Sequence, residues 1–336
     1  MKRQQRTLIR AVMIIAVMAG ILAVIILLSD QDWNARFTSP ENREEGNEAF
    51  MNEGVVTWNG KQYRKKGAMT TILVAGIDKE ETTASSYKVS YRDGGQADFL
   101  LLLAIDHEER KVHQLQIDRD TMAEVTVLGV YGNVTGTREL QICLAHNYGA
   151  RPEEQAGYTV EAVSRVLNGF EIDGYCMFGY GAVPDLNDLL GGIPVTVPED
   201  MTSVNPEWVA GRTLTLKGQE AETFVRTRKT IGSGSNQERM TRQAVYMRSA
   251  IEKMRNRFSQ DNGFVKEFLA LLHQVAVTNM SDQRLLTEIN DAKRYQILPV
   301  DYLAGEYVLG EYNYIEFYPE EGSAEAWVMT HLYQER

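Results

Sequence analysis

The chain has 336 residues, of which 43% are hydrophobic and 24% are charged, as in an ordinary globular protein. Its 46 Asp and Glu outnumber its 35 Lys and Arg, which gives a formal net charge of -11. This acidic balance argues against a general nucleic-acid-binding protein, which needs a broad basic surface, but it allows a local phosphate site. The two cysteines, Cys143 and Cys176, lie among apolar residues, so we expect two small buried side chains rather than a disulfide.

An apolar run near the N-terminus predicts a membrane anchor. Residues 11–28 carry no charge and are nearly long enough, as a helix, to cross the hydrocarbon core of a bilayer. Basic residues precede the run and acidic residues follow it, which places the tail 1–10 in the cytoplasm and the rest outside. A cleaved signal peptide is the alternative, but the run is long and no small-x-small cleavage site follows it. We expect a single-pass plasma-membrane protein whose polar linker, residues 29–54, carries an extracytoplasmic domain.

A series of strands is predicted after the linker. They are a hairpin at 55–69, centred on Asn59-Gly60, and strands at 71–77, 99–106 and 112–117. The last two are joined by a short polar turn and should pair in antiparallel fashion. Charged side chains stand where these strands begin or end, and a sheet holds such positions rigidly. These candidates for a site are Asp78, Asp98 and the cluster Asp118-Arg119-Asp120-Thr121.

Helices and strands alternate along the remainder of the chain. Apolar residues at helical spacing predict helices at 161–167, 184–190, 240–254 and 264–275, and strand patterns occur at 175–178, 195–197 and 295–318. We therefore expect an α/β fold, in which a mixed central β-sheet carries helices on both faces as an α/β/α sandwich.

Two stretches, 224–230 and 237–243, concentrate basic side chains in this acidic chain. The first alternates like a strand and the second has helical spacing, with a Gly/Ser turn between them. Guanidinium groups bind phosphate through paired, charge-assisted hydrogen bonds. One interpretation is a polyanion site, in particular for a pyrophosphate, and the other is a solvated basic face or ion pairs with the many Asp and Glu. The side chains expected to point to one place are Arg226, Arg228, Arg239, Arg242 and Gln243.

A divalent metal would offset the charge of a bound diphosphate. Asp78 and Asp98 are the candidate ligands, because hard cations prefer carboxylate oxygens. The alternative is that these two residues cap loops or pair with the arginines. The five histidines are scattered without metal-ligand spacing, and neither a nucleotide-binding P-loop nor the nucleophile elbow of hydrolases is present.

Taken in order, these motifs resemble those of the LytR-CpsA-Psr (LCP) family of cell-wall glycopolymer ligases. The resemblance covers about residues 70–255, and its specificity comes from the ordered set together with the anchor rather than from any single motif. The matching segments are Leu73 to Asp78, Ala97-Asp98, Asp118 to Thr121, Ala145 to Gly149, Tyr175 to Phe178, Leu186 to Val197, Leu216 to Ala221, Val225 to Lys229, and Arg239, Arg242 and Gln243.

The resemblance implies an LCP-like catalytic domain over 70–258, completed by helices and strands of 259–336. It implies transfer, assisted by Mg²⁺ or Mn²⁺, of a glycopolymer phosphate such as teichoic acid or capsular polysaccharide. The donor would be a polyprenyl-pyrophosphate carrier with its lipid in an apolar tunnel, and the acceptor a peptidoglycan hydroxyl. Its implied catalytic residues are Asp98, Arg119, Arg226 and Arg228. Its implied substrate-binding residues are Arg119, Arg226, Arg228, Arg239, Arg242, Gln243 and Gln141, and its metal ligands are Asp78 and Asp98.

The chain departs from the family pattern at several positions. Asp118 replaces a usual Pro, Gln141 stands where Lys is frequent, and Cys143 and His146 replace common Asn and Tyr. Loss of a cation at position 141 weakens pyrophosphate binding if that residue contacts the ligand. A non-catalytic binder of polyprenyl phosphates or anionic glycans therefore remains an alternative. A transcriptional attenuator fits poorly, because the predicted anchor places the domain outside and no helix-turn-helix signature is present.

Overall fold

The computed structural model describes residues 54–79, 91–228, 230–261, 263–283, 285–286 and 294–336. The predicted tail, the anchor and all of the predicted linker except Gly54 lie outside the described residues. Within the described part, no helix is both long enough and apolar enough to cross a membrane.

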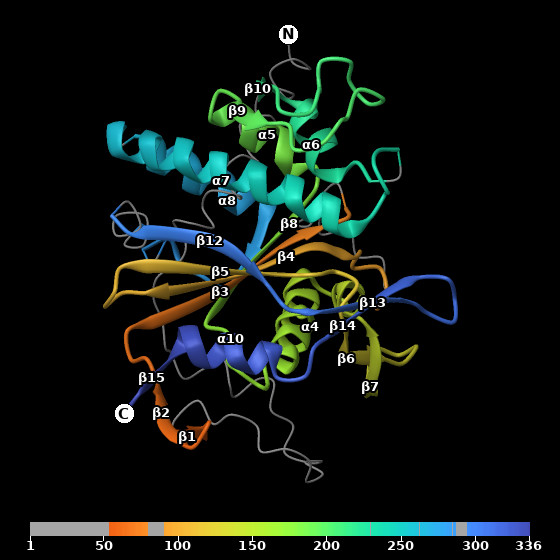
Figure 1. The fold of residues 1–336 in the computed structure, drawn as a ribbon, viewed down its shortest axis with the longest axis vertical. Helices are drawn as coiled ribbons and strands as arrows, with labels where there is room; N and C mark the ends of the chain where they lie inside the picture. Colours follow the sequence, from red (N-terminus) through yellow and green to blue (C-terminus); the bar gives the residue numbers. More distant parts are fainter. Residues whose placement is uncertain (1–53, 80–90, 229, 262, 284, 287–293) are drawn as a thin grey trace.

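A six-stranded sheet forms the centre of the fold (Figure 1). Its strands, in spatial order, are β11 (Ala276–Thr278), β8 (Gly174–Gly179), β3 (Met69–Ile77), β4 (Ala97–Asp106), β5 (Lys111–Ile117) and β12 (Gln296–Tyr302). The pairs β3–β8 and β5–β12 are parallel, whereas β3–β4, β4–β5 and β8–β11 are antiparallel. The prediction of a mixed sheet is confirmed. Strands β3 and β4 are buried almost throughout, which explains why they have continuous apolar runs rather than an alternating pattern.

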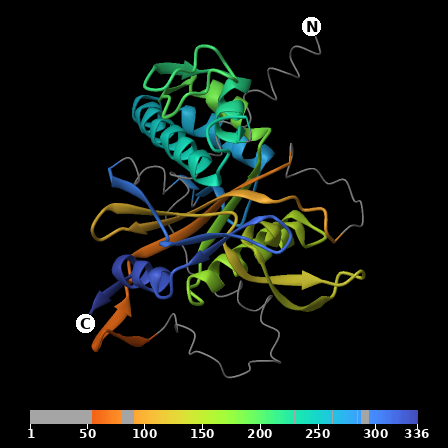
Figure 2. The ribbon, with the colours of Figure 1, turned by 45° about the vertical axis from the view of Figure 1, so that its right-hand side comes forward.

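Helices cover both faces of this sheet, which confirms the predicted three-layer arrangement (Figures 1 and 2). On one face lie α5 (Ala182–Leu189), α6 (Gln219–Arg226), α7 (Asn236–Gln260) and α8 (Phe264–Val275), and on the other α4 (Pro152–Val166) and α10 (Ser323–Leu332). Successive residues of β3 serve opposite faces, because Ile72 and Val74 belong to the first core and Leu73 and Ala75 to the second.

Smaller sheets and hairpins surround this body. The predicted N-terminal hairpin consists of β1 (Val55–Trp58) and β2 (Lys61–Lys65), and the positive φ angles of Asn59 and Gly60 agree with the expected type I′ turn. The C-terminal strand β15 (Tyr333–Glu335) pairs with β2. The other peripheral elements are β6 (Met122–Leu128) with β7 (Val134–Gln141), the 3₁₀ helix η1 (Ile142–Asn147), β9 (Ile193–Thr196) with β10 (Thr213–Leu216), and β13 (Gly305–Leu309) with β14 (Ile315–Pro319).

The prediction of a strand over 224–228 is wrong. This stretch is the end of helix α6, which stops at Arg226, and Arg228 follows in a loop. Ala221, Phe224 and Val225 are buried at helical spacing, and the Phe224 ring packs edge-on against Trp208. A short alternating segment cannot override this apolar helical face, so the two arginines come from a helix end and a loop rather than from one strand.

Candidate functional site

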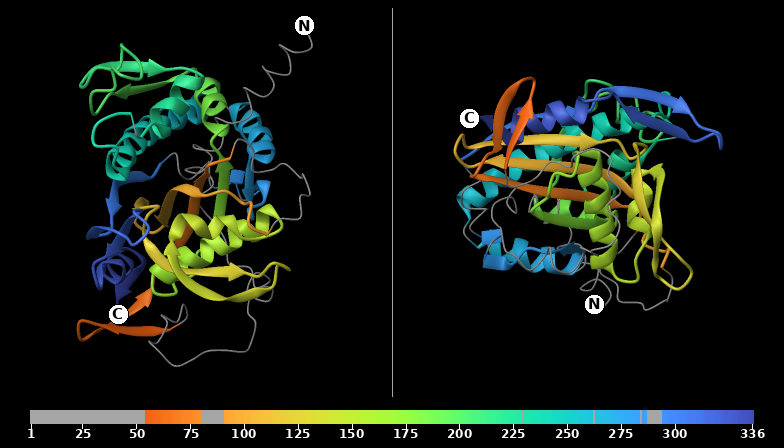
Figure 3. Two further views of the ribbon diagram at one scale, coloured as in Figure 1. Left: turned by 90° about the vertical axis from the view of Figure 1, so that its right-hand side faces the viewer. Right: turned by 90° about the horizontal axis from the view of Figure 1, so that it is seen from below.

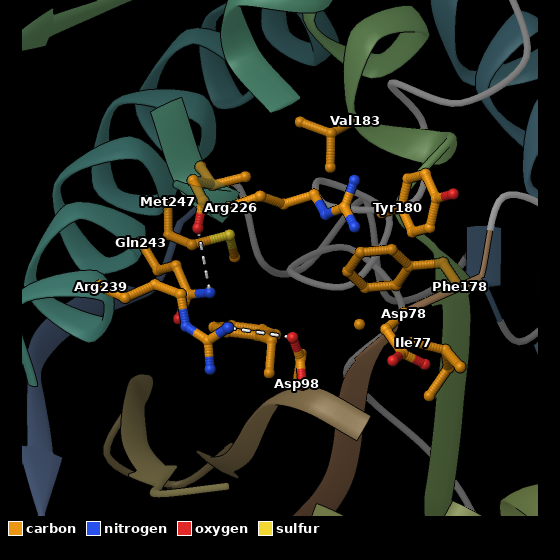
Figure 4. A pocket seen from close by; sticks show the side chains of 13 residues that line it. Ile77, Asp78, Asp98, Phe178, Tyr180, Val183, Arg226, Arg239, Gln243 and Met247 are labelled. Carbon is orange, nitrogen blue, oxygen red and sulfur yellow. Dashed lines mark hydrogen bonds and ion pairs between the residues drawn. The ribbon is translucent and has the colours of Figure 1, made fainter. Parts of the chain in front are cut away.

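Two arginines, Arg119 and Arg239, converge on Asp98 at the start of strand β4, and Figure 4 shows the contact from Arg239. Strands β4 and β5 run antiparallel, with Leu100 opposite Ile117, so the start of β4 lies beside the residues that follow β5. This register brings Arg119 to the Asp98 carboxylate, where its Nη1 donates to Oδ1. The first turn of α7 supplies Arg239, whose Nη1 donates to Oδ2 of the same carboxylate at 2.9 Å. Both arginines are largely buried, with side chains 14% and 6% exposed.

A chain of buried hydrogen bonds holds Arg239 from behind. Its Nε donates to Asn236 Oδ1 at 3.0 Å, and Asn236 Nδ2 donates to Asp118 Oδ1 at 2.6 Å. The other oxygen of Asp118 accepts from the hydroxyl of Tyr307 on β13 at 2.5 Å. Sequence reasoning missed Asn236 and Tyr307. The position of Asn236, three residues before Arg239 at the start of a capped helix, was the available signal, whereas no local pattern pointed to Tyr307.

An open cavity lies beside this cluster. Its polar side contains Asp78, Asp98, Arg226, Arg239 and Gln243. All five are residues that the sequence predicted for the site. The rest of its lining is mainly apolar or aromatic and comes from β3, β4, β8, α5, α6 and α7. These residues are Gly76, Ile77, Phe99, Phe178, Tyr180, Val183, Val225 and Met247. The cavity therefore offers cationic groups next to an apolar lining, which is the combination that an anionic lipid headgroup and its chain require.

Arg226 contributes to the cavity from the end of α6. Its guanidinium lies 3.7 Å from the centre of the Tyr180 ring, and its Nη1 donates to Glu222 Oε1 at 2.6 Å. Nearly half of its side chain is exposed, in contrast to Arg119 and Arg239. Stacking on Tyr180 fixes the guanidinium plane while leaving donors free for a ligand. Sequence reasoning missed Tyr180, which follows strand β8 directly.

Asp78, at the end of β3, caps the following loop. Its Oδ1 accepts from the backbone N of Gln96 at 2.6 Å, which matches the loop-capping alternative. Among the described residues, no group of three or more His, Cys, Asp or Glu side chains is placed to hold a metal ion. Asp98 matches the arginine-pairing alternative, because both of its oxygens accept from arginines. Mg²⁺ is often held by one or two carboxylates together with substrate phosphates, and the oxygen donors of Asp78 and Asp98 are of the type that such a metal prefers. The metal assignment stays a prediction.

Two other expected site residues lie close to the group formed by Arg119, Arg239 and Asp98, called the arginine cluster below. Arg228 donates from Nε to the carbonyl of Gly234 at 2.9 Å, and its charge acts on Asp120 and Arg239. Gln141 donates to Asp120 Oδ1 at 3.1 Å and to the carbonyl of Ile315 at 2.7 Å. Neither residue lines the cavity, so in this structure both act on the cluster from the side of Asp120.

The expectation that Arg242 points to the same place as Arg239 and Gln243 is wrong. Arg242 is fully buried, and its guanidinium binds the Glu199 carboxylate and the backbone carbonyls of Phe224 and Thr227. It lies next to Gln243 in sequence but on another side of α7. There it connects the end of α6 and the loop that follows to helix α7. Gln243 does reach the cavity, and its Oε1 accepts from Gln116 at 3.1 Å.

Crowding of like charges gives the cluster its electrostatic character. Burial lowers the pKa of Arg239, and the neighbouring Arg119 and Arg228 lower it further against the opposing effect of Asp98. Burial also raises the pKa of Asp120, with Asp118 adding to the effect and the arginines opposing it. A phosphate anion near Arg119 and Arg239 would relieve the repulsion between these cations.

Cys143 and Cys176 are free and buried, as expected. Burial raises the pKa of each thiol to about 12. The Cys143 sulfur also accepts from Nη2 of Arg119 at 3.1 Å, which helps to orient that arginine.

Comparison with known proteins connects this site to a family. The LytR_cpsA_psr family model matches residues 34–324. The chain is 26% identical over 184 residues to TagU of Halalkalibacterium halodurans, a polyisoprenyl-teichoic acid–peptidoglycan teichoic acid transferase, a match that covers 54% of this chain and 53% of TagU. It is 26% identical over 227 residues to TagV of Bacillus subtilis, which has the same transferase name, covering 66% of this chain and 51% of TagV. The chain thus spans about half the length of these two relatives.

Solved structures agree with the sequence comparisons. The crystal structure of B. subtilis TagV superposes with a TM-score of 0.60 at 22% identity, over 79% of this chain and 97% of that one. The structure of TagT bound to LI-WTA gives 0.59 at 20% identity, over 79% and 90%. At such identities the likeness establishes a common fold. Because the family model covers nearly the whole described sheet and its helices, the chain belongs to the LytR_cpsA_psr family.

Proposed function

We propose that this protein is a membrane-anchored, extracytoplasmic phosphotransferase. In this proposal it moves a glycopolymer phosphate from a polyprenyl-pyrophosphate carrier to a hydroxyl of peptidoglycan. The observation that carries the proposal is the convergence of Arg119 and Arg239 on Asp98 beside a largely apolar cavity that also contains Arg226. The transferase names of TagU and TagV support this choice of donor and acceptor.

The arginines would bind the diphosphate, and the apolar lining of the cavity would take the first part of the lipid. The acceptor oxygen would form a bond to the phosphorus that carries the glycopolymer, and the bridging P–O bond would break to release polyprenyl phosphate. Such transfers depend mainly on positioning and charge stabilisation, which guanidinium groups supply without a protein nucleophile.

Asp98 would take the proton of the attacking hydroxyl. In the structure both of its oxygens accept from arginines. Substrate phosphate must therefore draw at least one guanidinium away before an oxygen of Asp98 can accept that proton. This exchange would couple the filling of the donor site to the availability of the base.

Asp78 and Asp98 would hold Mg²⁺ or Mn²⁺ together with the substrate. The metal would supply further neutralisation of the diphosphate charge. Its presence can be tested independently of turnover, by measuring Mn²⁺ binding to the full chain with and without Asp78→Asn in the presence of inorganic pyrophosphate.

The central experiment measures release of polyprenyl phosphate by the full chain in detergent micelles. Removing one preorganised donor from a charged transition state costs about 10²- to 10³-fold in rate. Arg239→Lys should approach this loss because Lys cannot replace the bonds to both Asn236 and Asp98, and Arg226→Ala should lose less because that side chain is half exposed. Arg248→Ala, an exposed position on the same helix as Arg239, is the matched control. Unchanged release in both site variants would show that these arginines do not carry the activity, and no release by the parent chain would show that the enzymatic assignment is wrong.

A non-catalytic binder of lipid pyrophosphates is the second candidate. The engagement of both Asp98 oxygens by arginines favours it, since a carboxylate held in this way orients the guanidinium groups for binding but has neither oxygen free to accept a proton. Saturable binding of a polyprenyl pyrophosphate, with no release over many hours in the presence of Mg²⁺ and peptidoglycan, would support this candidate over the first.

The membrane location rests on the apolar run 11–28 and its flanking charges. A phosphatase reporter that is active only outside the cytoplasm, fused after Arg336, should be active in cells. An inactive reporter, with a cytoplasmic reporter active at the same position, would contradict this location.

A further inference from the structure

The hairpin β13–β14 projects from the body of the molecule (Figures 1 and 3). Its outer half is rich in exposed aromatic and aliphatic side chains. Tyr312 is 76% exposed, Tyr314 66% and Leu309 61%. Side chains of this size and number on one protruding element need a partner or a functional reason.

The strand register gathers the apolar residues on one face of the hairpin. Tyr307 pairs with Phe317, and two residues further out Leu309 pairs with Ile315. Because side chains alternate between the faces of a strand, all four share one face. The rings of Tyr307 and Phe317 pack at the base, 4.8 Å apart, and Phe317 is buried. An apolar strip therefore runs from the body of the protein towards the turn that holds Tyr312 and Tyr314.

The base of this strip is joined to the arginine cluster. The Tyr307 hydroxyl donates to Asp118, and the backbone N of Phe317 donates to the carbonyl of Asp120 at 2.8 Å. Asp118 and Asp120 flank Arg119 in sequence. Asp98 and Arg239 line the largely apolar cavity. The hairpin instead contacts Asp118 and Asp120, on the other side of the cluster. The strip and the cavity thus reach the arginines from different sides.

The charge of the hairpin limits what can bind to it. Residues 305–321 contain five glutamates and neither Lys nor Arg. An anionic lipid surface or a polyphosphate chain would be repelled by these charges. Sugar rings are uncharged, present apolar C–H faces that pack on tyrosine rings, and carry hydroxyls that donate to carboxylates. The hairpin therefore matches a glycan chain, and its acidic side chains would keep an anionic donor polymer off the same surface.

We infer that the outer half of hairpin β13–β14, from the apolar strip that starts at Tyr307 to the exposed tyrosines at the turn, docks the glycan chain of the acceptor and leads its hydroxyl to the arginine cluster. This inference rests on the proposed transfer function. The acceptor approaches along the hairpin while the lipid of the donor occupies the cavity, so the two substrates do not compete for one surface.

The test compares the full chain with the double variant Tyr312→Ser, Tyr314→Ser. The probes are peptidoglycan stripped of anionic polymers, in a sedimentation assay, and a soluble β-1,4-linked N-acetylglucosamine tetramer, in a titration. Loss of two exposed ring contacts should weaken the binding of both probes about tenfold, equivalent to about 1.4 kcal/mol. Binding of inorganic pyrophosphate to the double variant should match that to the parent, because neither tyrosine lines the cavity. Tyr131→Ser, on the exposed turn of the β6–β7 hairpin, is the matched control and should bind like the parent.

Several outcomes would overturn the inference. Glycan binding could be unchanged in the double variant, or Tyr131→Ser could lose as much binding as the double variant. The double variant could instead lose binding to phosphatidylcholine–phosphatidylglycerol vesicles while it still binds glycan, or it could sediment as a monomer where the parent sediments as a dimer. Failure of the proposed function has a different signature, namely no release of polyprenyl phosphate by the parent chain, and it leaves the glycan-binding comparison intact.

Discussion

Asp98→Asn tests whether the paired arginines are held by a single negative charge. Asn keeps one oxygen acceptor, so one of the two arginine contacts survives and the other guanidinium faces an amide donor. A hydrogen bond to a charged group contributes about 1.5–3 kcal/mol, and we take about 2 kcal/mol because Asp98 is partly exposed. At about 2–4 °C per kcal/mol for a large domain, the midpoint of thermal unfolding should fall by about 4–8 °C.

The same variant should bind anions more tightly. Without the Asp98 charge, Arg119 keeps its ion pair with Asp120 at 3.3 Å but Arg239 loses its pair with Asp98, so the repulsion between the two arginines grows. A phosphate anion would relieve that repulsion. If the affinity for inorganic pyrophosphate rises about tenfold, saturating pyrophosphate stabilises the variant by about 1.4 kcal/mol more than the parent. Release of polyprenyl phosphate should nevertheless fall, because the proton acceptor is lost.

Differential scanning fluorimetry with and without pyrophosphate measures both effects. Asp282→Asn is the control, because it removes the same charge from an exposed carboxylate that contacts His273. Equal unfolding midpoints for Asp98→Asn and the parent, together with equal shifts on adding pyrophosphate, would refute the view that Asp98 balances the two arginines.

Three further predictions concern buried polar groups. Tyr307→Phe removes a bond to Asp118, so the free energy of unfolding in urea should fall by about 1–2 kcal/mol, and an unchanged value would deny that bond any role. Because the pKa of Cys143 is about 12, iodoacetamide at pH 8 should leave the native thiol unlabelled in mass spectrometry but label it after unfolding; native labelling would contradict its burial. Burial lowers the pKa of His146 to about 3, so the unfolded chain binds a proton between pH 6.5 and 3 that the folded chain does not. Stability should therefore fall on acidification, by about 2 kcal/mol at pH 5 from this group. His146→Gln should show a shallower loss in urea unfolding between pH 7 and 5, and an equal slope would contradict this.

Strands with continuous apolar runs were predictable because burial on both faces dictates their composition. Strands β3, β4 and β5 lie within a few residues of their expected bounds, and the charged residues at their ends do meet in the case of Asp98 and Arg119. Helix α7 was predictable as well, since its apolar face recurs at helical spacing and Ser235 caps its start through the backbone N of Glu238.

The supporting side chains of the site were not predictable in this way. The series of hydrogen bonds from Arg239 through Asn236 and Asp118 to Tyr307 joins residues up to 189 positions apart. The spacing of apolar and polar residues within one segment cannot predict such a contact, because the contact forms only when the β13–β14 hairpin packs against the residues that follow β5.

The sequence by itself determined the α/β class, the mixed sheet and most of the charged residues that gather near Asp98. Its apolar periodicity and strand-end charges are local properties that burial and sheet geometry translate directly into structure. The tertiary structure alone decided that 219–226 is a helix, that Arg242 turns inward to Glu199, and that Arg226 stacks on Tyr180. Each of these outcomes depends on which partner a side chain meets across the fold, and packing between distant segments sets that choice.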